Sequence, residues 1–206
     1  MSAPTFDAVV LAGGTGRRLG GASKPDVELG GRRLLDHALD ATHGAAAVVV
    51  VAPETVAVPA GVRRTLESPP LGGPAAGIAA GLAALGVARE PAPLVLVLAC
   101  DVPRAASAVP ALVTATVGSM ADGACLVDSG GRRQWLVGVY RRSALERRFA
   151  AVAPDGAGGL GVGRLLEGLI LLDVPAVGTQ ALDVDTWGDL ARARADRPEA
   201  SPDPTS

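Results

Sequence analysis

This chain has almost no lysine and no asparagine at all. Its 19 lysine and arginine residues include a single lysine, Lys24, and it has no asparagine, two isoleucines and one tyrosine. These scarce residues are the ones written with A/T-rich codons, so the composition indicates a genome rich in G and C. Under such a bias arginine replaces lysine wherever either cation serves. Lys24 has either survived by chance or occupies a position that needs a compact ammonium rather than a planar guanidinium.

Other absences exclude whole classes of protein. Cys100 and Cys125 are too few for a disulfide framework or a zinc site, and neither His37 nor His43 has a partner at metal-binding spacing. A net charge of −2 argues against binding to a nucleic-acid backbone. Apolar runs such as 45–52 are too short to span a bilayer, and no secretory leader is recognisable. With 49% hydrophobic and 19% charged residues the chain is not disordered as a whole. We expect a soluble, cytoplasmic globular protein.

Predicted strands and helices alternate along the chain. Continuous apolar runs bounded by glycine are typical of strands buried on both faces of a parallel sheet. Such strands are predicted at 6–11, 46–52, 62–66, 94–99 and 170–174, and helical spacing predicts helices at 33–42, 74–85, 109–117, 143–151, 162–169 and 186–195. Thr186 and Asp189 have the spacing of a capping box. Two further strands, 123–127 and 134–140, flank a polar turn and predict an antiparallel element.

The pattern predicts one α/β domain over residues 1–195. Its fold class is a three-layer, Rossmann-like arrangement: a mostly parallel sheet with helices on both faces. Residues 196–206 are polar and rich in proline, so we predict a disordered tail there.

Glycines follow the first predicted strand. Residues 11–20 read LAGGTGRRLG, and Lys24 comes shortly after them. Glycine lets backbone N–H groups approach phosphate oxygens, while Arg17 and Lys24 supply positive charge. The segment matches neither a P-loop, which needs Gly-Lys-Ser/Thr, nor the dinucleotide fingerprint, because Gly16 and Gly20 are one residue too far apart. The alternative is an ordinary glycine-rich turn with solvated arginines.

An aspartate stands at the end of another predicted strand. Asp101 follows the apolar run 94–99 after one residue. Ligands of open α/β sheets bind beyond the carboxyl ends of the strands, where a carboxylate can hold Mg²⁺ against a phosphate. Alone, such an aspartate more often caps a turn or a helix. The neighbouring glycine loop favours the metal-binding interpretation.

Together these segments resemble the molybdopterin nucleotidyltransferases, and most of all the molybdenum cofactor guanylyltransferase group. The resemblance covers about residues 6–195. It rests on LAGGTGRRLGGASKP at 11–25, ESPPLGGPAAGI at 67–78, ACDVP at 99–103 and DVDTWGDL at 183–190. The first motif is specific for the nucleotidyltransferase superfamily, whereas the acceptor is less well defined. Relatives that activate sugars, isoprenoid precursors or phospholactate carry similar loops.

The resemblance implies roles for the matching residues. The glycine loop would wrap the base and phosphates, Lys24 would contact the phosphates, and Asp101 would bind Mg²⁺. Asp183 or Asp185 would supply a second metal contact, with helix capping as the alternative role. The implied nucleotide-binding residues are Leu11, Ala12, Gly13, Gly14, Gly16, Lys24, Gly73, Pro74, Gly77 and Asp101. The implied catalytic residues are Arg17, Lys24 and Asp101, and the implied metal ligands are Asp101 and Asp185.

Two departures from the family pattern concern the choice of nucleotide. Pro70 stands where the family has an aspartate that reads the guanine edge, and Pro53 stands where it has an asparagine. The resemblance therefore leaves GTP and CTP open as donors.

The implied reaction transfers a nucleoside monophosphate, foremost GMP from GTP, to the phosphate of molybdopterin with release of pyrophosphate. The acceptor oxygen is already ionised, so the protein needs cations and alignment rather than a general base. The implied partners are GTP or another nucleoside triphosphate, a molybdopterin-type acceptor, and transiently molybdoenzymes or cofactor chaperones, with neither nucleic acid nor membrane. The alternatives are a cytidylyltransferase, another phosphorylated acceptor, or a catalytically silent nucleotide-binding module. The intact set of Gly13, Gly14, Lys24 and Asp101 argues against the silent module.

Overall fold

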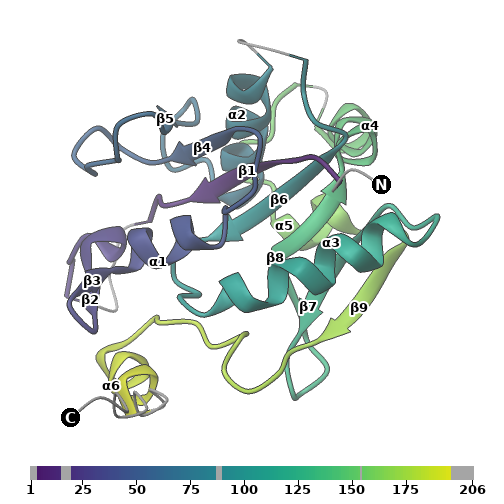
Figure 1. Cartoon of the computed structure of the whole chain (residues 1–206). Coiled ribbons are helices and arrows are strands. Elements are labelled where there is room, and N and C mark those ends of the chain that lie inside the picture. Colours follow the sequence, from purple (N-terminus) through teal and green to yellow (C-terminus); the bar gives the residue numbers. More distant parts are fainter. Residues whose placement is uncertain (1–3, 15–19, 87–89, 154, 196–206) are drawn as a thin grey trace.

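A seven-stranded sheet runs through the molecule (Figure 1). The computed structural model describes residues 4–14, 20–86, 90–153 and 155–195. The strand order is β5–β4–β1–β6–β8–β7–β9. These strands are β1 (Phe6–Leu11), β4 (Val48–Val51), β5 (Arg63–Thr65), β6 (Leu94–Ala99), β7 (Gly123–Val127), β8 (Arg133–Arg141) and β9 (Leu171–Pro175). Only β8 runs against its neighbours, β6 and β7, so the mostly parallel sheet with one antiparallel element is confirmed.

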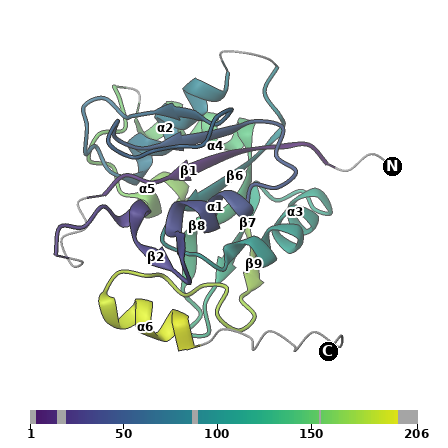
Figure 2. The same ribbon diagram turned by 60° about the vertical axis from the view of Figure 1, so that its left-hand side comes forward.

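Helices cover both faces of this sheet. One face carries α1 (Leu34–Asp40) and α3 (Val109–Val117), and the other carries α2 (Pro74–Leu85), α4 (Arg142–Val152) and α5 (Val162–Leu166) (Figures 1 and 2). Successive residues of a strand point to opposite faces. Val10 therefore packs in the same cluster as Leu35 and Leu112, whereas Val9 packs with Ile78. The predicted three layers are confirmed.

A small unit lies outside the three layers, next to the carboxyl ends of β1 and β6. It contains the 3₁₀ turn η2 (Lys24–Asp26), the hairpin of β2 (Glu28–Leu29) and β3 (Arg32–Arg33), and α6 (Trp187–Ala195). Figure 2 shows α6 beside β2, away from the sheet. A separate apolar cluster holds the unit together, and its buried members are Val27, Leu29, Leu34, Val184, Leu190 and Ala193.

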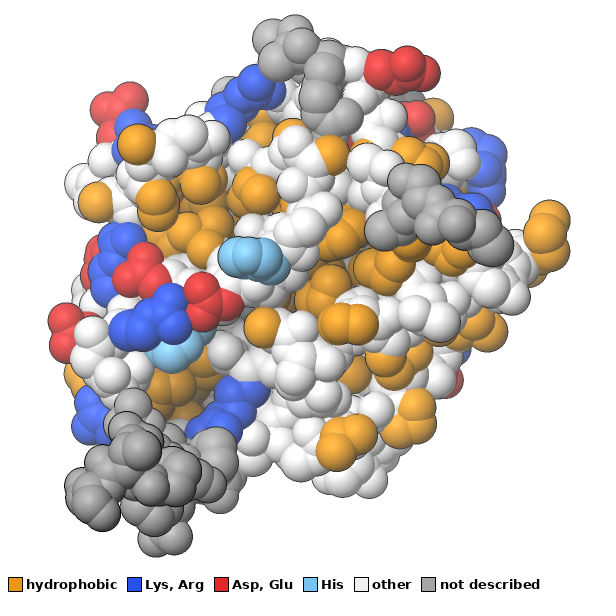
Figure 3. All heavy atoms as spheres, viewed as in Figure 1, with side chains coloured by type: hydrophobic (Ala, Val, Ile, Leu, Met, Phe, Trp, Pro, Cys, Tyr) orange, Lys and Arg blue, Asp and Glu red, His pale blue; other side chains and the backbone are white. Residues whose placement is uncertain are grey.

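Charged side chains of both signs gather on the surface over α1 and the hairpin, at the left of Figure 3. Arg32 pairs there with Asp40 at 2.8 Å, and Arg33 pairs with Asp36 at 2.7 Å. These ion pairs lie at the surface beside the hairpin, and the apolar cluster lies beneath them.

Several predicted boundaries need correction. The sequence analysis missed the hairpin and both 3₁₀ turns, η2 and η3 (Ala105–Ala108). The predicted helix 162–169 ends at Leu166, because Gly168 turns the chain with a φ of 86° before β9 starts. The predicted strand 46–52 is shorter, since only Val48–Val51 joins the sheet. The predicted tail at 196–206 lies outside the described residues.

Two glycines set the distance between α2 and β1. A Cβ atom on Gly81 would lie 2.4 Å from Val9 Cγ1, and one on Gly77 would lie 3.1 Å from Leu11 Cδ2. Gly77 is thus buried against the sheet, under the end of β1. This close packing fixes the start of α2 next to the loop that follows β1.

Replacing Gly81 with alanine is expected to lower the free energy of unfolding by about 1–3 kcal/mol, because the added methyl overpacks Val9. The loss should appear even though alanine favours a helix over glycine by about 1 kcal/mol. Chemical denaturation measures it. Gly163→Ala in α5 is the matched control, since its Cβ would meet only Trp135 Nε1 at 3.9 Å. Equal stability of the two variants would show that α2 has room to move.

Candidate active site

The ends of three parallel strands open onto one edge of the sheet. The backbone N–H of Cys100 donates to Leu11 O at 3.0 Å, and that of Ala12 donates to Val51 O at 2.9 Å. The loops that follow β1, β4 and β6 therefore start side by side (Figure 1). In an open α/β sheet this edge is where ligands bind.

One ammonium joins three segments that are distant in sequence. Lys24 Nζ donates to Asp101 Oδ2 at 2.6 Å and also to Asp185 Oδ1. Lys24 begins η2, Asp101 follows β6, and Asp185 precedes α6. The three side chains are 16%, 22% and 36% exposed, so they remain open to a ligand. Of the predicted site residues, the structure brings these three together.

Burial and neighbouring charges shift the pKa values of groups in this cluster. Burial would lower the pKa of Lys24, but the charge of Asp101 and its hydrogen bond, followed by those of Asp185, outweigh burial and raise that pKa above its usual value. Lys24 is therefore positively charged at neutral pH. Burial also raises the pKa of Asp183, and repulsion from Asp185 adds to the effect. Within the described residues, the Lys24 ammonium pairs with two carboxylates, those of Asp101 and Asp185.

A buried backbone contact and a helix cap hold Asp185 in place. The N–H of Val184 donates to Asp101 O at 2.8 Å, which ties the segment before α6 to the end of β6. Asp189 Oδ2 accepts hydrogen bonds from the N–H of Asp185 at 3.2 Å and from the N–H of Thr186 at 2.7 Å. The N–H of Asp189 in turn donates to Thr186 Oγ1 at 3.2 Å, so the predicted capping box is confirmed.

The glycine loop begins at this edge. Leu11 is half-buried and Ala12 is buried, while Gly13 and Gly14 are exposed and present their backbone to solvent. Gly16 and Arg17 lie outside the described residues. The structure therefore describes only the first part of the predicted nucleotide-binding loop, and this part directly follows β1.

The loop before α2 lies on the opposite side of the same edge. Gly73 has a φ of 89° and precedes Pro74, the first residue of α2. The N–H of Gly159 donates to Gly72 O at 2.8 Å, which joins the glycine-rich segment after α4 to this loop. Pro74 thus starts the helix at the edge, whereas Gly77 serves helix–sheet packing rather than facing the edge.

Glu67 and Leu71 shape this loop, and the sequence analysis, which included both in the motif at 67–78, gave neither of them a role. Leu71 is 73% exposed and has a φ of 64°, an uncommon conformation for a residue with a side chain. Its N–H donates to Glu67 Oε1 at 3.0 Å, and Glu67 is buried. The sequence signal for this contact was a glutamate followed closely by two prolines, which mark a turn. A carboxylate that is buried in a turn needs backbone N–H groups as hydrogen-bond donors. Pro70 lies between them and is exposed.

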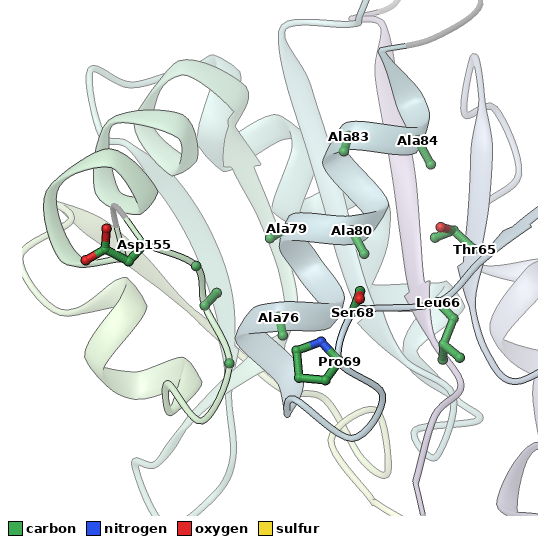
Figure 4. Close-up of a pocket in the computed structure, with 13 residues that line it drawn as sticks. Thr65, Leu66, Ser68, Pro69, Ala76, Ala79, Ala80, Ala83, Ala84 and Asp155 are labelled. Carbon is green, nitrogen blue, oxygen red and sulfur yellow. The ribbon is translucent and has the colours of Figure 1, made fainter.

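A shallow groove of about 810 Å³ runs along the outer side of α2 (Figure 4). Ala79, Ala80, Ala83 and Ala84 form its floor, and Ser68 and Pro69 close the end nearest the loop before α2. Asp155 lies across from them. The groove contains none of Lys24, Asp101 and Asp185, and it is separate from the candidate active site.

The site suits a hard divalent cation only in part. Within the described residues, no group of three or more His, Cys, Asp or Glu side chains is arranged to hold a metal ion. Asp101 and Asp185 nevertheless share one cation already, the Lys24 ammonium. Mg²⁺ is commonly bound by one or two carboxylates together with substrate phosphates. The donor set therefore fits Mg²⁺ that is bound together with a phosphorylated ligand.

Comparison with known proteins shows which family this chain matches. A family profile, the MobA-like NTP transferase domain, matches residues 8–169. A comparison with curated protein sequences finds no match.

Over the described residues, no helix has both the length and the apolar character needed to cross a membrane.

Solved structures share the fold over nearly the whole chain. A homologue of Mycobacterium tuberculosis rv0371c from Mycobacterium sp. strain JC1 is 25% identical with a TM-score of 0.69, and the match covers 92% of this chain and 95% of that one. Molybdopterin-guanine dinucleotide biosynthesis protein A from Archaeoglobus fulgidus is 22% identical with a TM-score of 0.67, covering 92% and 97%. The 2-C-methyl-D-erythritol 4-phosphate cytidylyltransferase from Thermus thermophilus is 21% identical with a TM-score of 0.65, covering 92% and 97%. At these identities the last two establish the fold.

Asp189→Ala is expected to lower the free energy of unfolding by about 1 kcal/mol at pH 7, because the helix cap is lost. Hydrogen bonds from Thr186 and Arg192 lower the pKa of Asp189 to about 2 from 3.8. Its ionised form therefore stabilises the fold above about pH 4, and this contribution disappears as the pH falls towards 2. Denaturation at several pH values measures both effects.

The control is Asp155→Asn, which also removes one acidic charge but lies in the loop across the groove. The difference in the free energy of unfolding between Asp189→Ala and the natural protein should close below about pH 3. The difference between the control and the natural protein should show no such pH dependence. A gap that stayed constant down to about pH 2 would contradict the role of Asp189.

Proposed function

Because the chain belongs to the MobA-like NTP transferase family and is a nucleotidyltransferase, we propose that it transfers GMP from GTP to the phosphate of molybdopterin. Nucleotidyl transfer follows from membership of the family. The nucleotide, the acceptor and the residue roles are the proposal. The observation that carries it is the cluster of Lys24, Asp101 and Asp185 beside the glycine loop.

The transfer is a displacement at the α-phosphorus of the nucleotide. An ionised oxygen of the acceptor phosphate forms a bond to that phosphorus, the bond to the bridging oxygen breaks, and pyrophosphate leaves with the electron pair. Because the attacking oxygen carries no proton, no general base is required. The protein has to hold two polyanions in line and reduce their repulsion.

The residues of the site divide this work. The exposed backbone of Gly13 and Gly14 offers N–H groups to the phosphates. Asp101 and Asp185 would hold Mg²⁺, which supplies positive charge against the triphosphate when it is bound. Lys24 then turns its ammonium from the carboxylates to the phosphate oxygens, since its flexible four-carbon stem allows a short swing. The same ammonium thus neutralises the carboxylates before binding and the nucleotide afterwards.

Cytidylyl transfer is the second candidate. Pro70 in the loop before α2 and Pro53 after β4 provide no side-chain hydrogen-bond donor or acceptor for a guanine edge. A site that hydrogen-bonds a base through its side chains discriminates strongly, and these two positions lack such groups. A phosphorylated acceptor other than molybdopterin uses the same chemistry. With molybdopterin as the acceptor, molybdoenzymes or cofactor chaperones would receive the product.

The function is tested with purified protein, Mg²⁺, molybdopterin and each of the four nucleoside triphosphates in turn, with products read by mass spectrometry. Formation of the guanine dinucleotide is the expected result. A cytosine dinucleotide would replace GTP with CTP as donor. No adduct with any of the four would overturn molybdopterin as the acceptor.

Asp101→Asn is expected to lower the turnover number by about 10²-fold or more, because charge stabilisation at the transferred phosphate is lost. Turnover is measured by pyrophosphate release with the donor and acceptor identified above. Asp155→Asn is the control for removal of an acidic charge outside the site. Mg²⁺-dependent turnover of Asp101→Asn near that of the control would sink the assignment of Asp101.

Lys24→Met is expected to bind Mn²⁺ about tenfold more tightly than the natural protein in the absence of nucleotide, since no ammonium competes for Asp101 and Asp185. The same variant should bind nucleoside triphosphate more weakly. Mn²⁺ titration followed by electron paramagnetic resonance measures the first effect without any reaction. Lys24→Arg keeps the charge and is the control; equal Mn²⁺ affinity in all three proteins would exclude competition between Lys24 and the metal.

A further inference from the structure

A second cavity lies on the side of α6 that faces α1. Its volume is about 590 Å³, within the range of about 300–1,000 Å³ that small-molecule sites occupy. Leu29 and Pro103 give it an apolar lining, and His37, Arg104 and Arg194 reach it from α1, from the turn before η3 and from α6. Figure 3 shows a hydrophobic hollow at the lower left, with blue side chains on both sides and a pale blue histidine above it.

The described residues that line this cavity carry charge of one sign. Arg104 and Arg194 are permanently charged, and none of the described lining residues is acidic. Within the described ranges neither arginine forms an ion pair, whereas Arg32, Arg33 and Arg192 nearby all do. Two guanidinium groups without a carboxylate partner attract an anion to the hollow between them.

Backbone carbonyl groups hold all three polar side chains in position. Arg104 Nη2 donates to Ala193 O at 2.9 Å, and Arg194 Nη2 donates to Glu28 O at 3.2 Å. His37 Nε2 donates to Leu29 O at 3.0 Å, which leaves Nδ1 for another partner. A guanidinium has five N–H donors, so one anchored nitrogen leaves the others for a ligand. The cavity is thus organised before any ligand binds.

One donor of Arg104 has no acceptor. Arg104 Nε is shielded from solvent and has no hydrogen-bond partner in the part of the chain that the structure describes. A buried donor without an acceptor destabilises a fold, so such groups are rare. An oxyanion bound to this guanidinium would supply the missing acceptor through a charge-assisted hydrogen bond.

We propose that this cavity is an anion site that takes a phosphate-bearing small molecule. The two guanidinium groups match a phosphate, and Leu29 and Pro103 match an apolar body attached to it. Lys24, Asp101 and Asp185 line no part of this cavity, so the proposal is independent of the proposed transfer reaction. Arg104 follows Asp101 by three residues, so the cavity borders the segment that comes directly after Asp101.

The two histidines of the chain make a local test practical. Imidazole signals of the full-length protein are followed by nuclear magnetic resonance at constant pH during titration with inorganic phosphate, and His37→Gln identifies the His37 signal. A saturable shift of His37 with phosphate is expected, with His43 as the internal reference and sodium chloride at equal ionic strength causing no such shift. Failure of His37 to respond to phosphate would overturn the site.

Arg194→Gln separates this cavity from the phosphate positions of the transfer reaction. It should weaken phosphate binding at His37 by about tenfold or more, because one charge-assisted contact is lost. Arg132→Gln removes an equal charge from the exposed turn between β7 and β8 and should leave the affinity unchanged. Equal affinity in Arg194→Gln and the natural protein, or equal losses in both variants, would show that the cavity is not the binding site.

Discussion

The contact of the Lys24 ammonium with Asp101 and Asp185 is the interaction on which the site depends. Without a cation between them the two carboxylates would repel each other, and the segment before α6 would lose its electrostatic tie to the end of β6. The backbone bond from Val184 to Asp101 acts in the same direction. The outer unit of hairpin, η2 and α6 is thus attached to the sheet edge by the groups that give the edge its chemistry.

Packing on the opposite side of the sheet complements this electrostatic tie. Gly77 and Gly81 let α2 approach β1 closely, and this approach carries Gly73 and Pro74 to the same edge. The loop before α2 then needs an irregular backbone, which Leu71 adopts with support from the buried Glu67. The loop before α2 and the cluster of Lys24, Asp101 and Asp185 therefore lie on the two sides of the glycine loop. Close packing of α2 on the sheet positions the first, and electrostatic contacts position the second.

The sequence predicted those strands and helices that have a regular pattern of apolar residues. The strand Leu94–Ala99 and the helix Pro74–Leu85 match prediction residue for residue, because buried strands and helices leave long apolar patterns. The hairpin was missed because strands of two residues carry no periodicity, although Gly30 and Gly31 marked its turn. Side-chain partners were harder still: the choice between Asp183 and Asp185 depends on the backbone direction that Asp189 imposes before α6. The pattern also assigned Lys24 to phosphates alone, since nothing in it reveals what a cation contacts before a ligand arrives.

The geometry of the cluster explains why one lysine persists among 18 arginines. A guanidinium is broad and planar, and it engages a single carboxylate best through two parallel hydrogen bonds. Lys24 instead places one compact nitrogen between two carboxylates that come from different segments. Where two parallel hydrogen bonds to one carboxylate form, arginine serves, as at Arg33, which donates to Asp36 through two nitrogens. This geometry favours the interpretation that position 24 needs a compact ammonium over chance survival of a lysine.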